Sequence, residues 1–257
     1  DAEPVVYWSL AGVAERGMAN HFSGSDVDAL DACERYLGGA VRGQMVADVP
    51  LGALLSGGID STAITALMQA NSSLPVRTFT IGFEEREYDE TVHARVVAAH
   101  LGTDHTELRL NGDDALALVP QLPEMYDEPF ADSSQLPTHL VMKLARQHVT
   151  VALSGDAGDE LFGGYNRYVH APKVWRRLGW MPLPMRRALG SGLTALPSDT
   201  INRLAGPLAR RVGIALPGDK AHKLGLRLRD LRSLDDLCVS LVSEWPQAEN
   251  MVIGGFM

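Results

Sequence analysis

A glycine turn between an apolar run and an amphipathic run constrains this chain more than any other feature. The turn is Ser-Gly-Gly-Ile-Asp-Ser at residues 56–61. Residues 49–55 before it are apolar and short enough for a buried strand, and residues 62–68 space their apolar side chains like one helix face. Glycines let the backbone approach an anion, and a helix N-terminus adds partial positive charge. The pattern therefore predicts a strand, a phosphate-binding turn and a helix.

The acidic residue in this turn indicates how phosphates would be held. No Gly-Lys-Ser/Thr follows the glycines, so no lysine awaits a γ-phosphate. Asp60 would repel bare phosphates, and a Mg²⁺ ion between them reconciles the charges. The alternative is that Asp60 or Ser61 only caps the helix.

Strand-like and helix-like runs alternate over the first 153 residues, with a further segment at 113–126. The strand-like runs are 51–55, 76–81, 105–110 and 149–153, and the helix-like runs are 26–46, 62–68, 88–101 and 136–148. Such alternation predicts an α/β fold with a parallel sheet flanked by helices and ligands at the carboxyl ends of the strands. The motifs follow Leu55, Ile81 and Leu153, as this rule requires.

The pattern changes near residue 171, where prolines begin to separate short helical pieces and strand signals end. We therefore expect a linker from a preceding domain at 1–24, a nucleotide-binding domain at 25–170 and a helical subdomain at 171–257. The chain begins at Asp1 and ends at Met257 without a polar tail, so we interpret both ends as cuts through a longer protein.

Composition narrows the class of protein. The chain is 46% hydrophobic and 21% charged, as in ordinary globular proteins, and no apolar run approaches the roughly 20 residues of a membrane span. Two cysteines, Cys33 and Cys238, favour a reducing cytoplasm over a disulfide framework. A net charge of −9 argues against nucleic-acid binding, although residues 166–232 hold 14 Lys and Arg against 3 Asp, a net of +11. We interpret this basic segment as solvated helix faces or a surface that meets another domain.

A second dense motif follows the last apolar run. Residues 153–165 read Leu-Ser-Gly-Asp-Ala-Gly-Asp-Glu-Leu-Phe-Gly-Gly-Tyr and place three carboxylates and four glycines within eleven residues. Carboxylates this close repel one another unless cations or hydrogen-bond donors separate them. The motif therefore predicts a functional turn, and the alternative is a capped helix start with solvated acids.

Residues 56–61 resemble the PP-loop of the ATP pyrophosphatases, and residues 153–165 resemble the signature of the synthetase domain of glutamine-hydrolysing asparagine synthetases. Further stretches are similar to that family: 48–52, 78–83, 88–90, 100–105 and 126–129. The resemblance is specific over about 41–168 and fades in the proline-rich tail. It implies the α/β fold of the PP-loop (adenine nucleotide alpha hydrolase) type.

The resemblance also implies roles for particular residues. It assigns adenine and ribose contacts to Leu54 and Ile81, and further ATP contacts to Ser154 and Gly155. Asp156 matches an acid that acts in adenylation and in taking a proton from ammonia, and Asp159 a carboxylate that binds Mg²⁺ or orients substrate. The implied pyrophosphate-binding residues are Ser56, Gly57, Gly58, Asp60 and Ser61, with Asp60 and Asp159 as metal ligands.

The implied reaction uses ATP and Mg²⁺ to adenylate the aspartate side chain, releasing pyrophosphate, after which ammonia displaces AMP to give asparagine. Ammonia would come from glutamine through a glutaminase domain that this chain lacks, so we expect no glutamine-dependent synthesis from the chain alone. The resemblance leaves room for a homodimer and implies no nucleic-acid or membrane partner.

The chain departs from the family at Asp156, where many members have Glu, and a family lysine is expected beyond Met257. Amidation of a sugar acid, a β-lactam-forming ring closure and a non-catalytic nucleotide-binding module remain alternatives.

Overall fold

The computed structural model describes residues 4–83, 89–126, 132–211 and 217–243. Of the motif residues above, Tyr88 and Asp127, Glu128 and Pro129 lie outside these ranges. The chain divides into two compact units, Asp1–Asp156 and Ala157–Met257. In the described ranges, no helix combines the length and apolar character needed to cross a bilayer.

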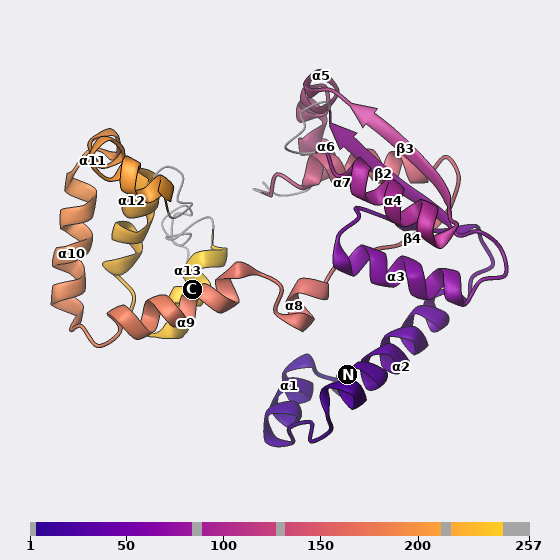
Figure 1. Cartoon of the computed structure of the whole chain (residues 1–257), viewed down its shortest axis with the longest axis horizontal. Helices are drawn as coiled ribbons and strands as arrows, with labels where there is room; N and C mark the ends of the chain where they lie inside the picture. The colour runs from indigo at the N-terminus through magenta and orange to yellow at the C-terminus, as the bar shows by residue number, and fades with distance from the viewer. Residues whose placement is uncertain (1–3, 84–88, 127–131, 212–216, 244–257) are drawn as a thin grey trace. The chain divides into compact units, whose positions relative to one another are not determined.

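The first unit is built on a four-stranded sheet with the order β3-β2-β1-β4 (Figure 1). The strands are β1 (Leu51–Leu54), β2 (Arg77–Phe83), β3 (Asp104–Leu110) and β4 (Val151–Leu153). Each neighbouring pair is parallel, with Ala53 opposite both Thr78 on β2 and Leu153 on β4. The predicted α/β fold with a parallel sheet is confirmed.

Helices cover both faces of this sheet, and the central strands β1 and β2 accordingly have consecutive buried residues, whose side chains point to opposite faces. On one face, Ala53 packs with Met68 of α3 (Ile59–Ala70), and Leu55 packs with Ala94 and Ala98 of α4 (Thr91–Leu101). On the other face, Phe79 packs with Leu144 of α7 (Gln135–Ala145). Because the strands are parallel, their carboxyl ends all lie at the same edge of the sheet, with core residues on both of its faces.

Local sequence signals explain where other helices of the first unit begin or break. Ser25 and Asp28 form a capping box at the start of α2 (Asp26–Gln44), as the predicted helix at 26–46 requires. Segment 113–126 is broken where Pro120 and Pro123 begin new pieces. Its elements are α5 (Gly112–Leu116), the 3₁₀ helix η2 (Val119–Gln121) and α6 (Leu122–Met125). Within the expected linker 1–24, the structure forms α1 (Leu10–Ala19), which has no buried residue.

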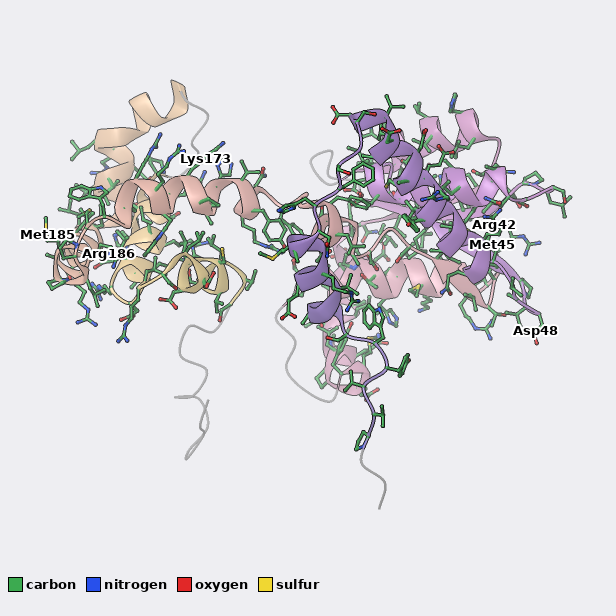
Figure 2. All side chains as sticks on the ribbon, turned by 90° about the horizontal axis from the view of Figure 1, so that it is seen from below. Arg42, Met45, Asp48, Lys173, Met185 and Arg186 are labelled. Atoms are coloured by element: carbon green, nitrogen blue, oxygen red, sulfur yellow. The ribbon has the colours of Figure 1, made fainter. Side chains whose placement is uncertain are left out.

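The second unit is helical throughout its described part. Its helices are α8 (Gly158–Phe162), α9 (Asn166–Leu178), α10 (Leu183–Ala195), α11 (Ser198–Arg211), α12 (Pro217–Leu228) and α13 (Leu234–Val242). Ala171 of α9, Leu228 of α12 and Leu237 of α13 share a core. Arg186 of α10, labelled in Figure 2, is only 5% exposed. Its guanidinium carbon lies 5.0 Å from the centre of the Trp175 ring. Cys33 on α2 and Cys238 on α13 are free and half-buried.

Candidate functional site

The phosphate-binding turn predicted at residues 56–61 joins β1 directly to α3. Leu55 N donates to Phe79 O of β2 at 2.9 Å. This hydrogen bond extends the pairing of β1 with β2 by one residue, to the start of the turn. Gly57 then adopts φ = 82°, a left-handed conformation that favours glycine. Gly58 is the N-cap of α3 and provides no side-chain cap. The first turn of α3 therefore keeps backbone N–H groups and the positive end of the helix dipole for a ligand.

Two serine hydroxyls hold this turn in shape. Ser56 Oγ lies 2.9 Å from Ser61 Oγ and accepts from Gly58 N at 3.2 Å. Ser61 Oγ accepts from Ser56 N at 3.2 Å and donates to Gly58 O at 3.3 Å. The turn is thus preorganised by its own side chains.

The second motif lies on top of the first. A Cβ atom added to Gly155 would come within 2.5 Å of Ser61 N and 3.0 Å of Asp60 Cβ, so only glycine allows this approach. Ser154 Oγ donates to Oδ2 of the exposed Asp156 at 2.9 Å, so a hydrogen bond joins the two residues on either side of Gly155. Two loops that are almost 100 residues apart in sequence are thereby joined at the carboxyl edge of the sheet. The residues that the structure brings together are Ser56, Gly57, Gly58, Asp60, Ser61, Ser154, Gly155 and Asp156.

Leu54 and Ile81 lie on neighbouring strands close to this edge. Leu54 is paired with Phe79, and Ile81 is two residues further along β2. Both side chains are half-buried and pack against the cluster formed by Phe79 and Leu144. They form an apolar surface next to the turn, of the kind that can contact a flat ring.

Asp159, the remaining predicted site residue, is on α8 and belongs to the second unit. There the backbone of Gly164 passes against its carboxylate, leaving no room for a side chain at position 164. Next to it, Tyr165 donates to Glu160 Oε1 at 2.9 Å, and this hydrogen bond raises the pKa of Tyr165. Arg167 stacks on Tyr165 with its guanidinium carbon 3.6 Å from the ring centre.

The donor set of the first unit suits a metal ion that arrives with phosphates. In the described ranges, no three His, Cys, Asp or Glu side chains are grouped to hold an ion by themselves. Mg²⁺ commonly takes one or two protein carboxylates together with substrate phosphates. Asp60, in the first turn of α3, is placed for that mode of binding.

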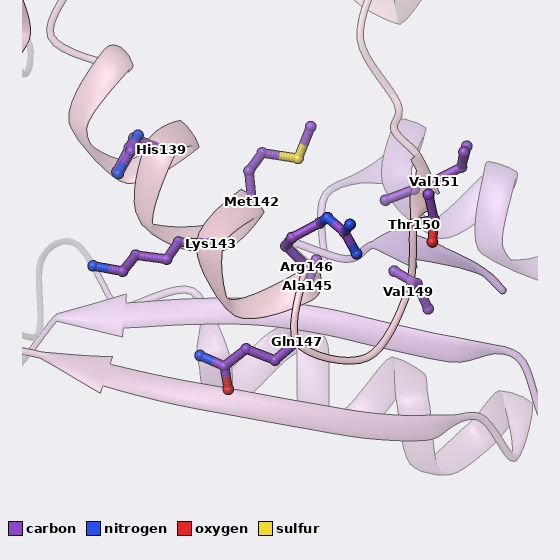
Figure 3. A pocket seen from close by; sticks show the side chains of 10 residues that line it. His139, Met142, Lys143, Ala145, Arg146, Gln147, Val149, Thr150 and Val151 are labelled. Atoms are coloured by element: carbon purple, nitrogen blue, oxygen red, sulfur yellow. The ribbon is translucent and has the colours of Figure 1, made fainter. Parts of the chain in front are cut away.

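A separate groove of about 720 Å³ lies between α7 and β4 (Figure 3). Its wall carries the side chains of Met142 and Arg146, and its floor includes Ala145, Val149 and Val151. None of the predicted site residues lines it, so it is distinct from the phosphate-binding turn.

Two features of the site were missed from sequence. Ala157, directly after Asp156, has φ = 71° and is the one described residue other than glycine with a positive φ. Alanine gives no sequence signal for this conformation. The first turn of α4 also contacts the site, because a Cβ atom on Gly57 would lie 2.6 Å from Ala94 N. The left-handed glycine could have indicated a close backbone neighbour, but not which one.

Comparison with known proteins agrees with the two motifs. The sequence model of the asparagine synthase family matches residues 32–249. Asparagine synthetase (glutamine-hydrolysing) 1 of Bacillus subtilis is 41% identical over 130 residues, which are 50% of this chain and 20% of that protein. A Methanocaldococcus jannaschii protein provisionally named as such a synthetase is 39% identical over 170 residues, 62% of this chain and 33% of its own length.

Asparagine synthetase (glutamine-hydrolysing) of Homo sapiens is 31% identical over 162 residues, which are 59% of this chain and 28% of that protein. The chain therefore spans no more than a third of the length of these curated relatives. The family match extends over most of the chain and includes both site motifs, so this chain belongs to the asparagine synthase family.

Proposed function

We propose that this chain binds ATP and transfers AMP to the side-chain carboxylate of aspartate, as the first half of asparagine synthesis. The observation that carries the proposal is the contact of Gly155 with the first turn of α3, which joins both family motifs in one site. A carboxylate is a poor acyl donor, and AMP gives it a good leaving group. The site must therefore hold pyrophosphate as it departs and a carboxylate as it attacks.

The glycine turn supports the first of these tasks. The N–H groups in the first turn of α3 have no side-chain cap, so we expect them to donate to the pyrophosphate as negative charge builds on it. The hydroxyl pair of Ser56 and Ser61 fixes those groups before ATP arrives, so little reorganisation is needed in the transition state. Leu54 and Ile81 offer an apolar surface to the adenine ring.

Asp60 is the residue of the first unit that we assign to Mg²⁺. When bound, the ion neutralises part of the charge that develops on the leaving pyrophosphate. Asp159 is on the second unit, and from its position in the family motif we assign it to Mg²⁺ binding or to the orientation of aspartate.

Asp156 is the group that we assign to proton transfer when ammonia replaces AMP. Ser154 donates to its carboxylate, and the neighbouring Gly155 lies against the first turn of α3. The shorter side chain compared with Glu is matched by the close approach of Gly155 to Ser61, which brings the backbone of this loop onto the turn. We further propose that the ammonia is produced from glutamine by a glutaminase domain outside this chain.

Product analysis with a set of acids tests this proposal. The full-length protein is incubated with ATP, Mg²⁺, ammonium and either aspartate, glutamate or a uronic acid, and pyrophosphate, AMP and amide are measured. When the acid is aspartate, we expect equal amounts of pyrophosphate, AMP and asparagine, and we expect no such products with the other two acids. Pyrophosphate release only with the uronic acid would instead assign a sugar-acid amidation. ATP binding without pyrophosphate release for any acid would contradict catalysis and leave a nucleotide-binding module.

A further inference from the structure

The start of α4 is held by a residue that lies just outside the helix. Glu90 is the N-cap of α4 and makes no side-chain cap. Asp89 takes that role, because its Oδ1 accepts from Thr91 N at 3.1 Å and from Thr91 Oγ1 at 2.5 Å. Thr91 is fully buried, so its hydroxyl depends on this carboxylate for a partner. The Thr91 hydroxyl also lowers the pKa of Asp89, which keeps the carboxylate ionised.

Asp89 has neighbours on both β2 and β3. A Cβ atom on Gly82, near the end of β2, would lie 2.6 Å from Asp89 Oδ1 and would also collide with Thr91. On the other side, Arg109 Nη2 of β3 lies 3.9 Å from Asp89 Oδ2, and Arg109 Nε also binds Glu107 at 3.1 Å. The strand ends therefore fix where this carboxylate sits, and the carboxylate fixes where α4 begins.

The first turn of α4 is in turn the wall behind the phosphate-binding turn. A Cβ atom on Gly57 would come within 2.6 Å of Ala94 N and 2.8 Å of His93 C, so backbone rests on backbone. Ala94 is fully buried and packs with Leu55, the residue that leads into the turn. A shift of this helix start by even an ångström would be transmitted to Gly57, because close-packed atoms leave no slack between them.

We propose that Asp89 is a positioning residue for the phosphate-binding turn: through Thr91 it fixes the first turn of α4, on which Gly57 rests. The inference rests on the proposed function, because it assumes that residues 56–61 hold the β- and γ-phosphates of ATP. In this role Asp89 acts through Thr91 and not by contact with the nucleotide. Its loss should therefore weaken the grip on these phosphates and leave the adenosine monophosphate part unaffected.

Calorimetric titration of the full-length protein with ATP and with AMP, both in Mg²⁺, tests this inference. AMP lacks the two phosphates that the turn would hold. For Asp89→Ala and Thr91→Val, we expect the Kd for ATP to rise about 3- to 30-fold, the range set by loss of a helix cap. The Kd for AMP should stay within about twofold of the wild type, since the adenine side is unchanged. Thr91→Ser keeps the hydroxyl, so its Kd for ATP should stay close to that of the wild type.

Asp236→Ala is the matched control. Asp236 completes the capping box at the start of α13, which belongs to the second unit. It should lower the thermal midpoint as a lost cap does, yet leave both nucleotide affinities unchanged. If Asp89→Ala does not fold, Thr91→Val and Asp89→Asn decide the matter, because each removes less of the packing.

The outcomes separate the two proposals. Equal ATP and AMP losses in the Asp89 and Thr91 variants, or none in either, would overturn the positioning role while wild-type ATP binding stands. A wild-type protein that binds no ATP would overturn the proposed function, and the positioning role with it.

Discussion

The polar side chains of the phosphate-binding turn fall into two groups: those that stabilise the turn itself, and one that we propose to act on the ligand. Ser56 and Ser61 satisfy one another and the backbone around them, so they maintain the turn before ATP arrives. Asp60 has a different position, in the first turn of α3, where a negative charge already favours the helix. That benefit explains how the acid is tolerated in the empty protein. Next to phosphates the same charge would be repulsive, and this repulsion is the reason that we propose a metal ion between them.

Replacing Asp60 with Asn tests this division. The substitution keeps the size of the side chain and removes its charge, so Mg²⁺ loses a ligand while the repulsion of bare phosphates also falls. We expect Asp60→Asn to weaken ATP binding strongly in Mg²⁺ and much less, or not at all, in EDTA. Calorimetry under both conditions measures this. Equal affinity of wild type and variant in Mg²⁺ would show that Asp60 serves only the helix.

Asp156 is the residue on which catalysis should depend without loss of binding. Asp156→Asn keeps the hydrogen bond from Ser154 and removes the basic oxygen. We expect the variant to fold and bind ATP like the wild type and to lose turnover by about 10²- to 10⁴-fold, as for a positioned acid–base group. Steady-state release of pyrophosphate and asparagine gives the comparison. Unchanged turnover would leave Asp156 with a structural role in its loop.

At the scale of elements, the sequence predicts the sheet better than the junctions. Alternating apolar and amphipathic runs are a property of each segment, and they placed all four strands. Contacts between distant segments have no such signal. Nothing in Ala157 indicates a left-handed residue, and the seating of Gly155 on Ser61 appears only when β1 and β4 are side by side. The start of α4 at Thr91 has a different cause, a local cap by Asp89, which is only two residues before Thr91.

The pairing of β2 with β3 also creates a polar contact that should make stability depend on pH. Thr78 Oγ1 lies 2.9 Å from His105 Nδ1, and His105 Nε2 is buried without a hydrogen-bond partner in the described ranges. Burial lowers the pKa of His105 below its ordinary value of 6.5, and Glu107 partly offsets this effect. The folded protein thus favours the neutral ring, whereas the unfolded chain takes up a proton near pH 6.5.

The stabilisation from neutral His105 is therefore present above about pH 6.5 and is lost as the pH falls below it. We expect the free energy of unfolding in urea to drop more between pH 7.5 and 5.5 for the wild type than for His105→Gln. Subtracting the drop in the variant from the drop in the wild type removes the contribution of the other histidines, which both proteins share. An identical drop in both would exclude His105 as the source.

At the scale of the whole molecule, the two units differ in chemistry. The first contains the sheet, the phosphate-binding turn and the ion pairs of Arg95, Glu107 and Arg109. The second contains the whole basic segment 166–232 and buries Arg186 against Trp175. Because the family match crosses both units, and the second motif supplies Asp156 to the first and Asp159 to the second, we expect catalysis to need both.

The central claim is that the aspartate side chain attacks the α-phosphate of ATP, and an oxygen isotope follows that bond directly. Aspartate labelled with ¹⁸O in its side-chain carboxylate is converted by the full-length protein with ATP, Mg²⁺ and ammonium, and the products are analysed by mass spectrometry. Adenylation followed by displacement with ammonia leaves one carboxylate oxygen on phosphorus, so we predict one ¹⁸O in each AMP and none in pyrophosphate. Label in inorganic phosphate with formation of ADP, or no label in any phosphorus product, would contradict the account.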